Sequence, residues 1–192
     1  MNTIEDDRRG TRSRMQFDVR EDDLASAQTR ELLALHLAGM HANSPPGTVF
    51  ALDLSGLQSP EVTVWTAWSA GQIAAVGALK LLSTDGAELK SMRTAPRFIR
   101  RGAASAILDK IINVARTRGI VRMSLETGNA PEFQPALAFY RARGFRNGAA
   151  FSDYEPNGFS EFLHLDLSWE GGQSPSKSGG YPATLGIVTK QE

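Results

Sequence analysis

The strongest structural signal in the sequence is an amphipathic helix predicted over residues 102–118. Six apolar residues recur there at helical spacing and form one stripe: Ala104, Ile107, Leu108, Ile111, Ile112 and Ala115. Gly119 follows and suits the left-handed residue that commonly ends a helix. Strands are expected on either side, at residues 88–94 and 121–126. A helix with one apolar face between two strands must pack that face against a sheet, so this segment predicts an α/β unit.

Further periodicities extend this unit in both directions along the chain. Alternating apolar residues predict strands at residues 15–20, 62–69, 72–82 and 161–167. Helical spacing predicts a first helix ending before Pro45, with the acidic residues 21–23 at its start, and a last helix at residues 135–143. Antiparallel strands followed by a strand–helix–strand–helix–strand run predict a mixed α/β sheet with helices on both faces.

Composition sets the domain organisation and excludes several functions. The 192 residues suffice for one domain, expected at 15–169, between a disordered extension at 1–14 and a flexible tail at 170–192. The chain contains no cysteine, which excludes a thiol nucleophile and a Cys-containing metal site, and no metal is expected. A formal net charge of zero argues against a nucleic-acid partner. The sequence has no apolar run long enough to cross a membrane and no signal peptide, so a cytoplasmic bacterial protein is expected.

The functional signal is the junction between the strand at 88–94 and the helix at 102–118. The helix opens on Gly102 and small residues, and a helix N-terminus exposes unpaired N–H groups that attract phosphate. Arg97, Arg100 and Arg101 would add positive charge beside them. A generic strand–loop–helix connection with a solvated basic loop fits the same residues. The P-loop and dinucleotide-binding motifs are absent.

Two segments resemble motifs of the GNAT N-acetyltransferase superfamily. The first is Glu88-Leu89-Lys90-Ser91-Met92-Arg93-Thr94-Ala95-Pro96 followed by Arg100-Arg101-Gly102-Ala103-Ala104. It is similar to the family's central motif, [Gln/Arg]-x-x-Gly-x-[Gly/Ala], in which Ile99 departs from the usual Gln or Arg. The second comprises residues 125–129 and 138–145, where Tyr140 precedes x-x-x-Gly-Phe. The resemblance covers most of residues 15–167 and implies a mostly antiparallel sheet with one splayed parallel strand pair.

The resemblance also implies acetyl-CoA as the co-substrate, with its pantetheine arm and pyrophosphate held largely by backbone N–H groups. The residues expected to bind it are Met92, Arg93, Thr94, Arg100, Arg101, Gly102, Ala103, Ala104, Ser105, Asn129 and Tyr140. An amine would then attack the thioester directly, while the Met92 N–H stabilises the oxyanion and Tyr140 protonates the leaving thiolate. Glu88 and Glu126 are the candidate general bases, and either could instead be a solvated or salt-bridged carboxylate.

The acceptor is expected to be an amine of a small molecule. Acetylation of a protein lysine or N-terminus, and a non-catalytic acyl-CoA sensor, remain alternatives. Some aromatic residues could line an acceptor pocket or belong to the core: Trp65, Trp68, Phe151 and Tyr154. The histidines, which are expected to be structural or exposed, are His36, His41 and His164. Homodimers are common in the family, but no sequence feature establishes one here.

Overall fold

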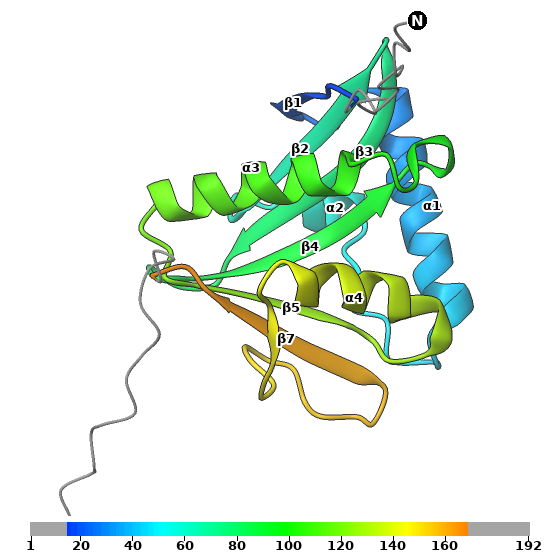
Figure 1. Ribbon diagram of the computed structural model, residues 1–192. Coiled ribbons are helices and arrows are strands. Elements are labelled where there is room, and N and C mark those ends of the chain that lie inside the picture. The colour runs from blue at the N-terminus through cyan, green and yellow to red at the C-terminus, as the bar shows by residue number, and fades with distance from the viewer. Residues whose placement is uncertain (1–14, 169–192) are drawn as a thin grey trace, which may run out of the picture.

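A single seven-stranded sheet organises residues 15–168, the part of the chain that the computed structural model describes (Figure 1). The strand order is β1-β2-β3-β4-β5-β7-β6. The strands are β1 (Asp18–Glu21), β2 (Val62–Ser69), β3 (Gln72–Leu81), β4 (Gly86–Thr94), β5 (Arg122–Gly128), β6 (Arg146–Asn147) and β7 (Ser160–Asp166). All neighbours run antiparallel except β4 and β5. The expected extension at 1–14 and tail at 170–192 lie outside the described residues.

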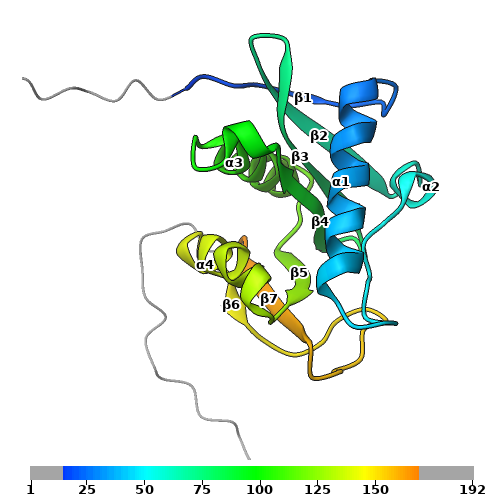
Figure 2. The ribbon, with the colours of Figure 1, turned by 90° about the vertical axis from the view of Figure 1, so that its right-hand side faces the viewer.

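Helices cover both faces of this sheet, as the alternation of strands and helices predicts. They are α1 (Ala27–Asn43), α2 (Leu54–Leu57), α3 (Ala103–Thr117) and α4 (Gln134–Ala142), with 3₁₀ turns at Pro96–Phe98 and Pro131–Phe133. Figure 2 shows α1 and α2 on one face and α3 and α4 on the other. None of the helices within residues 15–168 is long and apolar enough to cross a bilayer.

The apolar stripe of α3 forms the centre of the core on its face of the sheet. Ile107, Leu108, Ile111 and Ala115 are fully buried, whereas Ala104 and Ile112 lie at the edges of the stripe and are half-buried. Gly77 of β3 allows this close packing, because a Cβ atom there would lie 2.6 Å from Cγ2 of Ile107. The sequence pattern therefore identified the helix and its buried face correctly.

The first helix begins later than the sequence suggests. The acidic residues 21–23 were expected in its first turn, but α1 starts at Ala27 and has no acidic residue there. Leu24 has a positive φ of 64°, which turns the chain between β1 and the helix. The Asp22 carboxylate accepts the Leu24 N–H at 2.8 Å and stabilises this turn. Tertiary contacts of the carboxylate therefore replace the expected interaction with the helix dipole.

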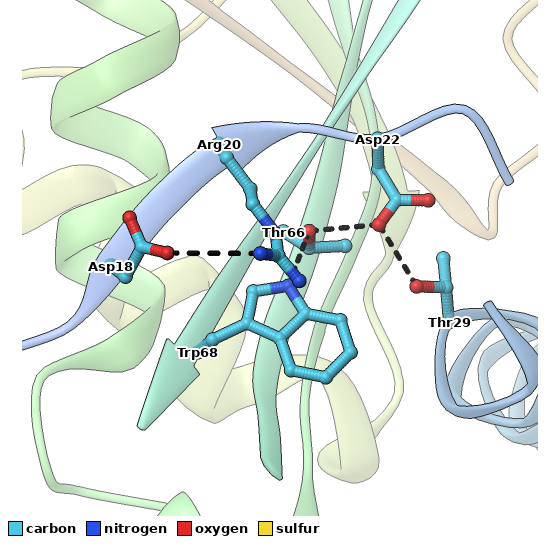
Figure 3. Close-up of polar contacts among 6 residues, drawn as sticks. All are labelled: Asp18, Arg20, Asp22, Thr29, Thr66 and Trp68. Carbon is cyan, nitrogen blue, oxygen red and sulfur yellow. Dashed lines mark hydrogen bonds and ion pairs between the residues drawn. The ribbon is translucent and has the colours of Figure 1, made fainter. Parts of the chain in front are cut away.

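Asp22 joins α1 to the sheet through two buried hydroxyl groups (Figure 3). Its Oδ2 atom accepts the hydroxyl protons of Thr29 at 3.0 Å and Thr66 at 2.9 Å, and both threonines are fully buried. The Trp68 indole N–H donates to the Thr66 oxygen at 2.8 Å. The Arg20 guanidinium lies over the Trp68 ring, 4.7 Å from its centroid. One carboxylate thus satisfies donors from both α1 and β2.

The parallel strands β4 and β5 separate soon after they begin. They pair only from Gly86–Arg122 to Glu88–Ser124. Beyond that point β4 continues along β3 to Thr94, while β5 continues along β7 to Gly128. The expected splayed pair is therefore present and opens a gap in the middle of the sheet.

A β-bulge interrupts β4 within this open stretch. Lys90 faces Ala78 and Arg93 faces Val76, so one residue of β3, Gly77, lies opposite two residues of β4. Ser91, in the bulge, has a positive φ of 53°. A bulge leaves one residue of the strand outside the hydrogen-bond ladder and redirects the side chains beyond it.

Candidate active site

A cavity of about 330 Å³ lies on the α3 and α4 side of the sheet, along the open part of β4. Met92 and Thr94 of β4 form one wall, and Phe139 and Tyr140 of α4 form another. The N-terminal end of α3 closes the far end. This cavity therefore joins the splayed strands to the helix end that the sequence marks as an anion site.

The turn into α3 has the geometry of an anion site. Arg100 and Gly102 have positive φ angles of 60° and 95°, which bend the backbone sharply before the helix. Gly102 is the N-cap and provides no side-chain hydrogen bond to the first turn. The helical bonds begin with the Ala106 N–H donating to the Gly102 carbonyl at 3.0 Å. The earlier N–H groups of the first turn are thus free of helical partners and suit a pyrophosphate.

Most of the residues expected to bind acetyl-CoA line this cavity. They are Met92, Arg93, Thr94, Arg100, Gly102, Ala103, Ala104, Ser105 and Tyr140. Arg101 does not line it, and its guanidinium instead lies 3.9 Å from the Met15 sulfur. Asn129 is also outside it: its side chain donates to the Gly158 carbonyl at 2.8 Å and holds the segment before β7. The structure thus groups nine of the eleven expected residues around one cavity.

A second cavity, of about 180 Å³, lies on the α1 side of the sheet. Helix α1, the segment around Phe50, and the open ends of β4 and β5 form its walls. Four residues line both this cavity and the larger one: Met92, Arg93, Ala136 and Tyr140. The two cavities therefore meet in the gap between the splayed strands.

Tyr140 lies where the two cavities meet. Its side chain is buried, with its ring centroid 5.4 Å from that of Phe139 and 5.7 Å from that of Phe145. Burial raises the pKa of its phenol well above the ordinary value, so the hydroxyl stays protonated at neutral pH. Within residues 15–168 its side chain makes no hydrogen bond. A protonated hydroxyl on a residue that lines both cavities suits a proton donor.

The two candidate carboxylates occupy different environments. Glu126 lines the smaller cavity, and burial raises its pKa above the ordinary value while a Ser160 hydrogen bond and the Lys90 charge oppose the shift. Glu88 lines neither cavity and is 3% exposed. A raised carboxyl pKa brings a general base closer to neutral pH. The geometry thus favours Glu126 over Glu88 as the group that reaches an acceptor.

Glu88 instead belongs to a buried polar cluster. Its Oε1 atom lies 3.0 Å from Lys90 Nζ and accepts the Tyr154 hydroxyl proton at 2.5 Å. Lys90 Nζ also donates to the Tyr154 oxygen at 2.7 Å. The ring of Tyr154 packs edge-on against Phe50, which lines the smaller cavity, with centroids 5.0 Å apart. The cluster holds Lys90 in place and supports Phe50 in the wall of the smaller cavity.

The aromatic residues proposed from sequence for an acceptor pocket do not line either cavity. Trp65 and Trp68 lie on β2, which is separated from the splayed pair by β3, and both are buried. Phe151 packs against Tyr154 and Phe162. Alternating residues locate a strand face but not the distance of that strand from the gap. Of the two alternatives left open by the sequence, the structure places both tryptophans in the core.

The histidines have separate roles. His36 lines the smaller cavity, and burial, with the nearby charges of Arg93 and Lys90, lowers its pKa to about 4, which keeps the ring neutral. His164 bridges the Ser124 hydroxyl at 2.8 Å and the Ala149 carbonyl at 2.9 Å, a structural arrangement on β7. Within residues 15–168 no cluster of three or more metal-ligating side chains is placed to hold a metal ion.

Sequence reasoning missed two features of the site. The first is the bulge at Ser91, which no residue pattern announces, because serine rarely adopts a positive φ. The second is the side chain of Arg93, which the sequence assigned to the cofactor through its backbone and which extends toward Gly39 of α1. Neither could be found without knowing which face of the sheet each residue occupies.

The model of the Acetyltransferase (GNAT) family matches residues 29–145, which include the splayed strands, the turn into α3 and Tyr140. The chain belongs to this family. Among curated proteins, the uncharacterized N-acetyltransferase YedL of Escherichia coli is 44% identical over 151 residues, which are 79% of this chain and 95% of the relative. The uncharacterized N-acetyltransferase YsnE of Bacillus subtilis is 41% identical over 149 residues, 78% of this chain and 99% of the relative.

Solved structures share the GNAT fold. A candidate acyl-CoA N-acyltransferase of Klebsiella pneumoniae superimposes with a TM-score of 0.67 at 24% identity, covering 79% of this chain and 98% of that one. A Bacillus subtilis acetyltransferase solved in complex with CoA gives 0.59 at 19% identity, with 79% and 99% covered. The expected family, fold and enzyme class, an acetyl-CoA-dependent N-acyltransferase, are thereby confirmed.

Proposed function

We propose that this GNAT protein transfers the acetyl group of acetyl-CoA directly to an amine of a small molecule, through a tetrahedral intermediate. The observation that carries the proposal is the meeting of two cavities, on opposite faces of the sheet, at Tyr140. The larger cavity, beside the N-terminus of α3, holds the acyl donor, and the smaller one holds the acceptor. This arrangement brings both substrates together without a covalent enzyme intermediate.

The larger cavity fits the donor by its chemistry. The unpaired N–H groups at the start of α3 bind the pyrophosphate, and the open edge of β4 near Met92 pairs with the pantetheine arm. The solved Bacillus subtilis neighbour contains CoA, which supports this placement. The small residues Gly102, Ala103 and Ala104 allow the close approach that backbone contacts require.

Three groups then perform the proton and charge transfers. Ser91 and Met92 lie in the bulge opposite Gly77, and the Met92 N–H stabilises the oxyanion. Glu126, directly or through a water molecule, takes a proton from the acceptor ammonium, and Tyr140 protonates the departing thiolate. Glu88 acts as a positioning residue by holding Lys90 and Tyr154.

The size of the acceptor cavity favours a small molecule over a protein side chain. At about 180 Å³ it is smaller than the 300–1,000 Å³ typical of drug-sized ligands, and it is walled by α1, the Phe50 segment and β5. A protein lysine or N-terminus would need a groove that accommodates the neighbouring backbone. A non-catalytic sensor would not require a second cavity opening onto Tyr140.

Calorimetric CoA binding and a thiol-release assay with acetyl-CoA and a panel of amines test the proposal. Ala104→Glu places a carboxylate where the pyrophosphate binds, and we expect CoA affinity to fall at least about tenfold by charge repulsion. The fold should persist, because an acidic residue in the first turn of a helix is favourable. Asn113→Glu, on the exposed side of the same helix, is the matched control. Equal affinities for the two variants, or no thiol release with any amine, would refute the proposal.

A further inference from the structure

Two residues that line the acceptor cavity carry buried polar atoms without a hydrogen-bond partner among residues 15–168. Among residues 15–168, three buried side-chain polar atoms lack a hydrogen bond: Ser44 Oγ, Ser91 Oγ and Arg93 Nε. Two of these, on Ser91 and Arg93, belong to residues that line the smaller cavity. Leaving a buried donor unpaired costs about 1–3 kcal/mol, and more for a charged group. Two such atoms at one cavity indicate a ligand group that the protein does not itself supply.

The bulge in β4 places the Arg93 side chain on the acceptor side of the sheet. Because Gly77 lies opposite two residues of β4, Lys90 and Arg93 occupy the same face although they are three positions apart. Met92 points to the opposite face, where its sulfur would lie 2.5 Å from a Cβ atom at Gly77. Without the bulge, strict alternation would place Arg93 on the α3 side.

Helix α1 leaves room for the guanidinium. Gly39 faces it, and a Cβ atom at that position would lie 3.5 Å from Nη1 of Arg93. A larger side chain on this turn of α1 would occupy the space in which the guanidinium lies. Its Nε atom is buried without a partner among residues 15–168, while the residue as a whole is half-buried and lines the cavity.

Arg93 is the uncompensated cation of this wall. Lys90 is neutralised by Glu88 at 3.0 Å, whereas no ion pair of Arg93 occurs among residues 15–168. His36 is uncharged at neutral pH because its pKa is lowered to about 4. The opposite wall carries the carboxylates of Glu126 and Glu132. The cavity therefore has one positive end and one negative end.

We propose that the acceptor is an amine that also carries a carboxylate, as an amino acid does. The Arg93 guanidinium, assisted by the Ser91 hydroxyl, binds the carboxylate, and the amino group faces Glu126 and Tyr140. This assignment rests on the proposed function, since it names the substrate class of the same site. The planar guanidinium fork matches the two oxygens of a carboxylate, which explains why arginine, and not another lysine, suits this position.

A carboxylate fits better than a phosphate monoester. A phosphate monoester carries nearly two negative charges at neutral pH, and among residues 15–168 only one uncompensated cation lines the cavity. Glu126 and Glu132 on the other wall would repel the excess charge. A cavity of about 180 Å³ also suits a molecule of amino-acid size.

The transfer step balances with the groups present. The ammonium loses one proton to Glu126, and the amine nitrogen forms a bond to the thioester carbonyl carbon. The C–S bond then breaks, the thiolate takes a proton from Tyr140, and Tyr140 recovers one from the acylated nitrogen. One proton in net is released to solvent through Glu126. The product is an N-acetyl amino acid whose carboxylate remains on Arg93.

Matched acceptors provide the first test: several amino acids, their primary amides, the corresponding decarboxylated amines, and a phosphorylated amine. We expect wild-type kcat/KM to be at least about tenfold higher for the acids than for the amides, because an unpaired guanidinium rejects the amide. Arg93→Met should abolish this preference, and Ser91→Ala should reduce it less. CoA affinity should stay unchanged in both variants, since the cofactor contacts at this position come from the backbone. Neither variant should unfold at a lower temperature than wild type, because each loses a buried donor that has no partner among residues 15–168.

Equal wild-type rates for acids and amides, a preference for the phosphorylated amine, or a preference that survives Arg93→Met would each overturn the inference. Ser91→Ala keeps the test valid if Arg93→Met does not fold. Calorimetry separates this inference from the proposed function, using N-acetyl amino acids and their amides as probes of the CoA-bound protein. Arg93-dependent binding of the acid, without thiol release from acetyl-CoA, would support the carboxylate site and refute the transfer reaction. Thiol release with acids and amides alike would support the transfer reaction and refute the carboxylate site.

Discussion

Two tyrosines near the splayed strands should respond to the same substitution in opposite ways. Tyr140→Phe removes only a hydroxyl that makes no hydrogen bond within residues 15–168, and the ring contacts with Phe139 and Phe145, at 5.4 Å and 5.7 Å, are kept. Stability and CoA affinity should therefore change little. If this hydroxyl protonates the thiolate, kcat should fall by about 10²–10⁴-fold, the range typical of a lost general acid.

Tyr154→Phe removes a hydroxyl that is fully engaged. It donates to Glu88 at 2.5 Å and accepts from Lys90 at 2.7 Å, and the Glu88–Lys90 ion pair at 3.0 Å remains when it is lost. Hydrogen bonds to charged groups contribute about 1.5–3 kcal/mol, so we expect a loss of about 2 kcal/mol in the free energy of unfolding. For a domain of this size that corresponds to a fall of about 4–8 °C in Tm. The tyrosine lines neither cavity, so kcat should change less than about tenfold.

The comparison requires calorimetric unfolding, CoA titration and steady-state thiol release on both variants. Each variant is the control for the other, because both delete one phenolic oxygen from a buried or half-buried ring. A Tyr140→Phe enzyme with kcat within about threefold of wild type would refute the acid assignment. An equal fall in turnover for both variants would show that packing, and not proton transfer, explains the role of Tyr140.

Three further substitutions have expected outcomes of different kinds. Glu126→Gln should lower kcat/KM by about 10²-fold and remove the acidic limb of its pH profile, which the raised pKa places above pH 4.5 in the wild type; an unchanged limb would contradict the base assignment. At neutral pH the same variant should be as stable as wild type or more stable. Because the pKa of Glu126 is raised in the folded protein, its ionisation lowers the free energy of unfolding as pH rises through that pKa. Asp22→Ala should cost about 3 kcal/mol in urea unfolding by leaving two buried hydroxyls unpaired, whereas Asp23→Ala, which loses one exposed bond, should cost less than about 1 kcal/mol. His36 has a lowered pKa, so its contribution to stability is present above pH 6.5 and is lost as pH falls toward 4; His36→Gln should flatten that decline, and His41→Gln on the exposed side should not.

The sequence located the elements of the fold with small errors at their ends. The stripe on α3 identified both the helix and its buried face, since period and burial are both local properties. The start of α1 was misplaced because Asp22 resembles a residue that favours a helix dipole, while its carboxylate accepts from the Leu24 N–H, from Thr29 and from Thr66 of β2, more than forty positions away. The two residues of β6 were not foreseen, because so short a strand has no periodicity to detect.

The turn before α3 illustrates what the sequence determined by itself. Gly102, followed by small residues after a strand, specifies a helix that begins without a side-chain cap, and the first-turn N–H groups are then free to bind an anion. Residue order fixes these features because they depend on a few neighbouring residues and on backbone geometry. The family motifs around this turn then predicted that the anion is part of an acyl-CoA.

The tertiary structure decided which side chains meet across the gap. The sequence offered both Glu88 and Glu126 as candidate bases, but Glu88 is held by Lys90 and Tyr154 while Glu126 lines the smaller cavity. Arg93 reaches that cavity because one bulged residue reverses the alternation of β4. Such outcomes depend on the face, register and spacing of strands that are distant in the chain, and a one-residue change in register reverses them.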